Sequence, residues 1–290
     1  MIGISPQTMT SPRRPAGLPR PHRRACGLGM SPRLVAALAG AFAVGAAAFA
    51  WPLFLSPDSI AEPLQAPLLF ALVIPLVLVV VLSAVSDGGL DVKALALLGV
   101  LAAVGSVLRP LSAGIAGFEL VFFLLVLGGR VFGPAFGFAL GAVTLFASAL
   151  LTAGVGPWLP YQMIAAGFVG LFAGLLPKAR GRAEVALLVA YGVVAAFGFG
   201  CLMDLAFWPF GVGQGTDLSF QAGAPPLDNL RRFALYDLAT SLGWGVGRAV
   251  TNAVCLALLG GPLLRLLRRS ARRGQFADCA DFADNRPDKA

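Results

Sequence analysis

The feature that most constrains this chain is a series of long apolar segments. Eight of them follow one another, at about 34–55, 67–86, 93–108, 111–128, 131–152, 160–177, 184–208 and 235–264. Roughly 20 consecutive apolar residues are enough for a helix to cross the hydrocarbon core of a bilayer. Helices satisfy their own backbone hydrogen bonds, which lipid cannot do. The sequence therefore predicts an all-α integral membrane protein with about eight spans.

The two ends of the chain differ from this apolar middle. Only 12% of all residues are charged, about half the fraction of a soluble domain. Residues 1–33 are rich in Pro and Arg and lack periodicity, and the tail from 268 to 290 is first basic and then acidic. Such segments cannot bury enough apolar surface to fold. We therefore predict disordered tails at 1–33 and 268–290.

The first apolar segment allows two interpretations. An Arg-rich flank, an apolar run and the small-residue sequence Ala48-Phe49-Ala50 also fit a cleaved secretory signal. The run continues through 51–55, and its length favours a retained transmembrane helix.

Positive charge predicts the orientation, because Lys and Arg are enriched in cytoplasmic loops. With eight spans, 18 of the 22 basic residues fall in the tails and in the loops on their side. Arg109, Arg231 and Arg232 fall on the other side, and Arg248 lies within the last span. An odd number of spans would separate the two basic tails. We therefore expect cytoplasmic termini and outer loops at 56–66, 109–117, 153–159 and 209–234.

Small residues recur at four-residue spacing, which lets helix backbones approach closely in lipid. They are Gly133, Gly137 and Gly141 in the fifth segment, Ala166, Gly170 and Gly174 in the sixth, and Gly243 and Gly247 in the last. Packing inside the bundle is the favoured interpretation, and docking of another membrane protein is the alternative. The candidate docking set on the third segment is Gly99, Ala102, Ala103 and Ser106.

Ionisable residues within or beside the spans are candidate functional residues, because lipid makes them costly. They are Glu119, Asp204, Asp237 and Arg248. Two interpretations of these residues stay open. Arg248 forms a structural ion pair with Asp204 or Glu119, or the charged residues bind a ligand. The two interpretations are compatible if paired charges line a pocket.

The last segment also carries a polar face. Asp237, Ser241, Trp244, Arg248 and Asn252 follow 4-3-4-4 spacing, which predicts one side of a helix. Lipid would not accept this face, so we expect it to point into the bundle.

A corner between the fifth and sixth segments, TAGVGPWLPYQM at 152–163, has an unusual composition. Its glycines and prolines predict a tight turn. Trp158, Tyr161 and Gln162 combine aromatic walls with a polar group, as small-molecule sites do, although the two aromatics also suit interfacial anchors. The loop at 209–234, preceded by Trp208, has a similar composition. We infer an outward-facing small-molecule site that is covered by outer loops.

Several classes of chemistry lack their motifs. The sequence holds no GxxxxGK[ST], HExxH or GxSxG, and its single histidine, His22, lies in the basic tail. The four cysteines are scattered, without a CxxC, so neither a disulfide framework nor a metal site is expected. We therefore expect no enzyme activity and no cofactor in this chain.

The segment at 117–177 resembles the substrate-binding S-component of the energy-coupling factor (ECF) vitamin transporters of bacteria. The similar elements are the acidic Glu119 opening a short helix, the block GGRVFGPAFGFALGA, the corner GxGPWxPxQM, the helix AGFVGLFAGLLP and the final TNAVCLALLGGPLLRLLRR. The resemblance implies a six-helix domain at 91–267, preceded by two extra transmembrane helices at 34–90.

The resemblance also implies what the chain does and with which partners. An S-component binds a vitamin-like molecule on the outer side of the bacterial cell membrane, and a membrane coupling protein and two cytosolic ATPases complete the importer. No nucleic acid is involved. By position the pocket would draw on Glu119, Trp158, Tyr161, Gln162, Asp204 and Asn252, with Trp158 and Gln162 first. Trp208, Asp237, Trp244 and Arg248 complete the candidate substrate-binding set.

The charges point to different substrates. Intramembrane acids favour a cationic or neutral ligand, whereas Arg109, Arg231 and Arg232 would attract an anion. The corner and the long 209–234 loop suggest cobalamin as a hypothesis. A stand-alone secondary transporter with an ion site at Asp204 or Glu119 is the alternative function, and a purely structural membrane subunit is a third.

Overall fold

The computed structural model describes residues 31–50, 52, 65–86, 92–111, 117–211, 215–221 and 223–284. This part of the chain forms nine α-helices and no strand. The helices are α1 (Pro32–Ala50), α2 (Gln65–Ser86), α3 (Val92–Leu111), α4 (Val121–Phe132), α5 (Pro134–Leu151), α6 (Leu159–Leu175), α7 (Gly181–Gly211), α8 (Pro226–Thr240) and α9 (Leu242–Asp284). Among the described residues, α1, α3, α5, α7 and α9 are long and apolar enough to cross a membrane. The apolar stretches of α2, α4 and α6 are shorter, so the count of eight spans stays a prediction.

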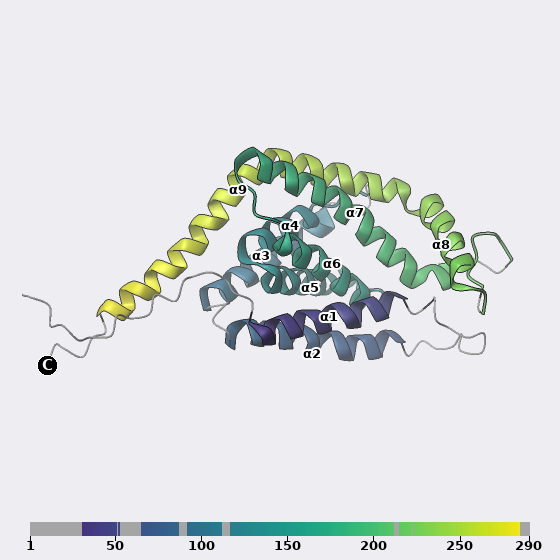
Figure 1. The fold of residues 1–290 in the computed structure, drawn as a ribbon, viewed down its shortest axis with the longest axis horizontal. Coiled ribbons are helices and arrows are strands. Elements are labelled where there is room, and N and C mark those ends of the chain that lie inside the picture. The colour runs from purple at the N-terminus through teal and green to yellow at the C-terminus, as the bar shows by residue number, and fades with distance from the viewer. Residues whose placement is uncertain are drawn as a thin grey trace, which may run out of the picture.

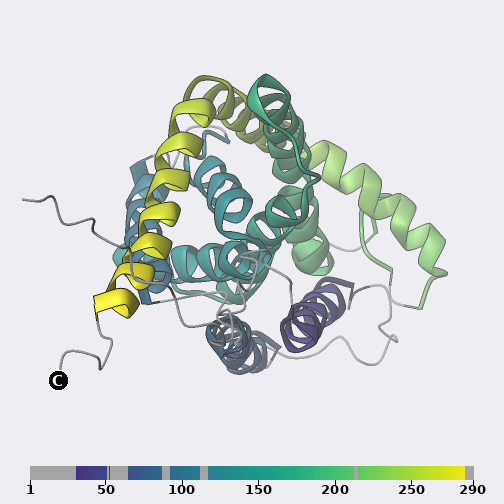
Figure 2. The same cartoon turned by 60° about the vertical axis from the view of Figure 1, so that its left-hand side comes forward.

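The helices form three groups (Figures 1 and 2). α7 and α9 pack side by side, α1 and α2 form a pair, and α3 to α6 lie between these two groups. α8 projects from the end where α7 finishes and α9 begins.

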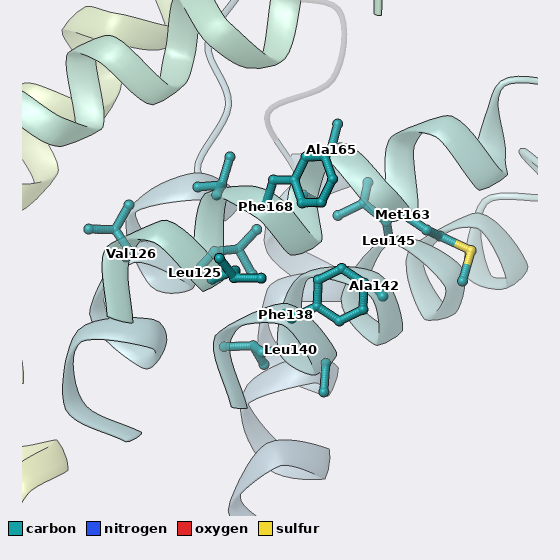
Figure 3. Close-up of a cluster of buried hydrophobic side chains, with 14 of the residues drawn as sticks. Leu125, Val126, Phe138, Leu140, Ala142, Leu145, Met163, Ala165 and Phe168 are labelled. Carbon is teal, nitrogen blue, oxygen red and sulfur yellow. The ribbon is translucent and has the colours of Figure 1, made fainter. Parts of the chain in front are cut away.

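The centre of the bundle is built on α4. Every residue from Val121 to Gly129 is buried, because this helix is apolar on all sides and α5, α6 and α9 surround it. Leu125 and Val126 of α4 join Phe138 of α5 and Phe168 of α6 in one cluster (Figure 3). With 12 residues, α4 is about 18 Å long, shorter than the roughly 30 Å hydrocarbon core of a bilayer.

Glycine contacts hold α5 against α6, as the small-residue spacing predicted. A Cβ added to Gly137 or to Gly170 would fall onto the carbonyl oxygen of the other residue. A Cβ on Gly141 would meet the Ala166 carbonyl, and one on Gly174 would meet Pro134. The packing interpretation is therefore confirmed for this helix pair.

Two glycine predictions change. Gly133 joins the contact through its backbone, since a Cβ on Gly174 would lie 2.7 Å from its carbonyl carbon, but its φ of 94° also ends α4, and Pro134 then starts α5. Gly243 faces open space within the described structure, whereas Gly245, two residues on, lies against the Phe197 ring. The packing interpretation is therefore wrong for Gly243 within the described structure, because spacing does not reveal which face meets a neighbour.

Three predicted boundaries also change. The fourth segment was expected to be helical from 111, but residues 117–120 are irregular and α4 begins at Val121. The eighth segment breaks at Ser241, which separates α8 from α9. α9 then continues to Asp284, beyond the expected start of a disordered tail at 268. Good helix formers such as Ala, Arg and Gln occur along this extension. Most of the predicted N-terminal tail lies outside the described residues.

The candidate docking set on α3 divides between two faces. Gly99 and Ala103 are exposed, and a Cβ on Gly99 would meet nothing within 4 Å in the described structure. Ala102 and Ser106 are buried, on the side where Gly105 approaches Thr144 of α5. Only Gly99 and Ala103 are therefore open to a partner, and their docking role stays a prediction.

Candidate functional site

A cavity of about 370 Å³ lies at the end of the bundle next to the α8–α9 junction. Its lining comes from α3, α4, α5, α6, α7, α8 and α9 and from the short segment before α4. The lining residues are Arg109, Glu119, Val121, Phe122, Leu145, Gln162, Phe199, Gly200, Met203, Asp204, Thr240, Ser241, Trp244 and Arg248.

The buried guanidinium of Arg248 dominates one wall. It lies between two rings, 5.4 Å from the Phe122 centroid and 5.0 Å from the Phe199 centroid. It donates to Glu119 at 2.8 Å and to the Ala196 carbonyl at 3.1 Å. Among the described residues its Nε has no partner. The predicted ion pair of Arg248 with one of two carboxylates is thus confirmed, with Glu119 as the partner.

A glycine brings Glu119 to this wall. Gly117 has a φ of 74°, and a Cβ there would fall onto the Trp244 carbonyl of α9. Only glycine adopts this conformation readily and allows such a close backbone approach. The segment before α4 therefore runs directly over α9, which places Glu119 beside Arg248.

A second polar contact at the cavity joins α3 to α6. Arg109, in the last turn of α3, donates to the Gln162 side-chain oxygen at 2.9 Å. Arg109 was expected in an outer loop, since the third segment was predicted to end at 108. The helix runs three residues further, which turns Arg109 into a lining residue.

The third polar group is Asp204 of α7. Its carboxylate accepts a hydrogen bond from the Ser241 hydroxyl. The Thr240 hydroxyl lies 3.2 Å from the same carboxylate and donates to the Tyr236 carbonyl at the shorter distance of 2.7 Å. Both hydroxyls lie at the break between α8 and α9. Asp204 therefore ties α7 to this break and still lines the cavity.

The cavity combines opposite charges with apolar surface. Its formal charges are two arginines and two carboxylates, which cancel. Phe122, Phe199, Leu145 and Met203 supply apolar walls. Apolar walls with a few placed polar groups are typical of sites for small molecules. The balance of charge suits a neutral or dipolar ligand better than a multiply charged one.

Half of the candidate residues from the sequence meet in this cavity. Glu119, Gln162, Asp204, Trp244 and Arg248 all line it. The expected continuous polar face from 237 to 252 is wrong, because the break at Ser241 puts its first part on α8.

The other candidates lie elsewhere. Trp158 is 43% exposed and covers Gly156 in the corner turn. Tyr161 is buried between the Phe49 and Phe207 rings, and Trp208 is buried and donates to the Leu218 carbonyl at 2.6 Å.

Asp237 and Asn252 are the remaining two. Asp237 is half-buried on α8, and Asn252 is buried deeper in the bundle, where it donates to the Gly192 carbonyl at 3.0 Å. Neither lines the cavity.

Sequence reasoning missed most of the apolar lining. Phe122, Phe199 and Met203 read as ordinary membrane-helix residues, and nothing in their spacing marks them. Thr240 carried no signal either, because the α8–α9 break was not foreseen.

A second charged cluster ties the opposite end of the bundle together. Glu184 of α7 is buried and pairs with Arg130 of α4 at 2.7 Å and with Arg268 of α9 at 2.6 Å. Arg130 also donates to the Leu176 carbonyl at 2.9 Å. Because its members satisfy one another, this cluster has a structural role. Within the described residues, no group of three or more His, Cys, Asp or Glu could hold a metal ion.

The described structure has five helices long and apolar enough to cross a membrane, and a charge-containing cavity lies at one end of their bundle. This architecture is that of a multi-pass membrane protein. The family model for the substrate-specific component of ECF transporters matches residues 93–259, more than half of the chain and every residue that lines the cavity. The chain belongs to this family of transporter subunits. It is therefore a component of a membrane transport complex that handles a small-molecule substrate. No curated protein and no solved structure matches the chain.

Proposed function

We propose that the chain captures a small neutral or dipolar molecule in this cavity, on the extracytoplasmic side, for an ATP-driven ECF-type importer. The observation that carries the proposal is the coincidence of the family match with the cavity. All of the lining residues fall within 93–259. ATP hydrolysis would come from two cytosolic ATPases, joined to this subunit by a membrane coupling protein.

The cavity also informs the size of the substrate. Its volume of about 370 Å³ is near the lower end of small-molecule pockets. The cobalamin hypothesis relied on the 209–234 loop covering the site, yet no described residue of that loop lines the cavity. The described part instead folds around Trp208 and forms most of α8. We therefore propose a substrate smaller than cobalamin.

Substitutions in the cavity test this proposal against the sequence-based choice of Trp158. The protein is extracted gently from its own membranes, and its bound small molecule is weighed by native mass spectrometry. We expect Gln162→Ala and Asp204→Asn to lower the occupancy, and Trp158→Ala to leave it unchanged. Loss of the adduct in Trp158→Ala alone would overturn the assignment of the cavity. An adduct with the mass of a cobalamin would overturn the proposed size.

The stand-alone transporter makes a different prediction. It would move the identified molecule into vesicles that contain only this chain and no ATPase. We expect no such uptake, because Glu119 is paired with Arg248, and Asp204 accepts a hydrogen bond from Ser241.

A further inference from the structure

α1 lies outside the residues that match the family model, yet one of its faces is buried. Leu34, Leu38, Ala41, Gly45 and Phe49 form this face, with 4-3-4-4 spacing. The face packs on α6 and α7, and α2 packs beside α1 (Figure 1). α1 is therefore part of the bundle rather than a detached anchor.

The contacts show that α1 runs antiparallel to α6. Phe49 meets Tyr161, with ring centroids 5.6 Å apart, and Phe42, two turns earlier, meets Phe172 at 6.0 Å. Between them, a Cβ added to Gly45 would lie 2.6 Å from Ile164 and still closer to the Phe168 ring. The residue numbers of the contacts fall along α1 as they rise along α6, so the two helices run in opposite directions. These contacts extend over three turns of α6.

The Phe49 end of this contact lies next to the cavity. Tyr161 is 6% exposed and also packs edge-on against Phe207 of α7, at 5.4 Å. The next residue, Gln162, lines the cavity and accepts the hydrogen bond from Arg109. Phe207 is one helical turn from Met203, another lining residue. Tyr161 thus connects α1 to two walls of the cavity.

We propose that α1 is a positioning element of the substrate site, in which Phe49 acts through Tyr161 to hold Gln162 and its hydrogen bond with Arg109. The proposal rests on the function proposed for the cavity. It gives the first of the two extra N-terminal helices a role beyond membrane anchoring, since packing at the first turn of α6 fixes a side chain that reaches the ligand.

The test measures the position of Gln162 without needing the substrate. A Gln162→Cys variant is made in a background without the four native cysteines, and its reaction rate with a water-soluble methanethiosulfonate is followed. A Trp244→Cys variant reports on the opposite wall. We expect Phe49→Ala to raise the rate at position 162 several-fold and to leave the rate at 244 unchanged. Phe49→Leu, which keeps the bulk, should restore the slow rate.

Phe42→Ala is the control, because it removes the aromatic contacts of α1 with Phe168 and Phe172 of α6, two turns of α1 away from Phe49. We expect it to leave both rates unchanged. The proposal is overturned if Phe49→Ala leaves the rate at 162 unchanged, if Phe42→Ala has the same effect, or if both cysteines react faster together.

Occupancy by the co-purified small molecule provides the second readout. Phe49→Ala should lower it and Phe42→Ala should not, and equal occupancy in the two variants would contradict the positioning role. A wild-type protein without any adduct would count against the function proposed for the cavity, whereas the labelling rates would still decide whether Phe49 positions Gln162.

Discussion

Among single residues, Arg248 combines a full positive charge with a side chain that is only 7% exposed. Taking a charge out of water costs several kcal/mol unless other groups replace the water. Glu119, the Ala196 carbonyl and two phenylalanine faces do so here. The Nε has no partner among the described residues and is itself buried, so the guanidinium is paired in the described structure through its two terminal nitrogens.

Breaking the Arg248–Glu119 pair should have unequal effects. Glu119 is 27% exposed, so Arg248→Met leaves a carboxylate that water can reach, and we expect a loss of about 1 kcal/mol. Glu119→Gln leaves the buried guanidinium without its counter-ion, and we expect a loss of about 3 kcal/mol. Unfolding in detergent measures both. A larger loss for Arg248→Met, or a double variant less stable than Glu119→Gln, would contradict the pair as described.

Asp237 should make stability depend on pH. It lies on α8, outside the candidate membrane spans, and burial and then the neighbouring Asp204 raise its pKa. The folded state therefore holds this proton more tightly than the unfolded chain. Its contribution is fully present below the unfolded pKa, near 4, and is lost as the pH rises through the folded pKa. Asp237→Asn should remove this loss and raise the melting temperature at neutral pH. A melting temperature that falls on substitution would refute this.

Among the helices, the α5–α6 contact depends most directly on residue size. Gly137 and Gly170 place backbone against backbone, so no methyl group fits between them without moving one helix. In lipid, where apolar burial does not drive helix association, such close contact is a main source of stability.

Gly170→Ala should therefore destabilise the protein by about 3 kcal/mol, because the added Cβ forces the helices apart. Gly198→Ala is the control. Gly198 lies on α7 in open space within the described structure, and alanine there should gain up to about 1 kcal/mol of helix stability. Melting temperatures of the two variants in the same detergent give the comparison. Equal effects would mean that the close approach is unimportant.

The same scale shows what sequence could and could not predict. Hydropathy located the eight apolar helices of the described residues, and small-residue spacing identified the α5–α6 contact, because both depend on local composition. The break at Ser241 and the α1–α6 register depend on contacts between distant segments, which periodicity does not reveal. For the same reason, the sequence predicted only some of the residues that line the cavity. Its charged residues stood out in an apolar chain, whereas Phe122 and Phe199 did not.

At the scale of the whole molecule, a separate group of paired charges ties the helices together at each end of the bundle. The Glu119–Arg248 pair lies at the cavity, and the Arg130–Glu184–Arg268 cluster lies at the other end. Arg248 and Arg268 are 20 residues apart on α9, or about 30 Å, which is the thickness of a bilayer core. This spacing supports a cavity near one membrane surface, and the distribution of basic residues predicts that this surface is the outer one.

The measurement that tests the account most directly is a native mass spectrum of the complex, extracted gently from its own membranes. We predict an assembly of this chain with a membrane coupling protein and two ATPase subunits, and a small-molecule adduct carried by this chain. The occupancy by this adduct should fall in Asp204→Asn and stay unchanged in Trp158→Ala. A chain that carries no partner and no adduct, and that imports a solute into vesicles by itself, would contradict the account.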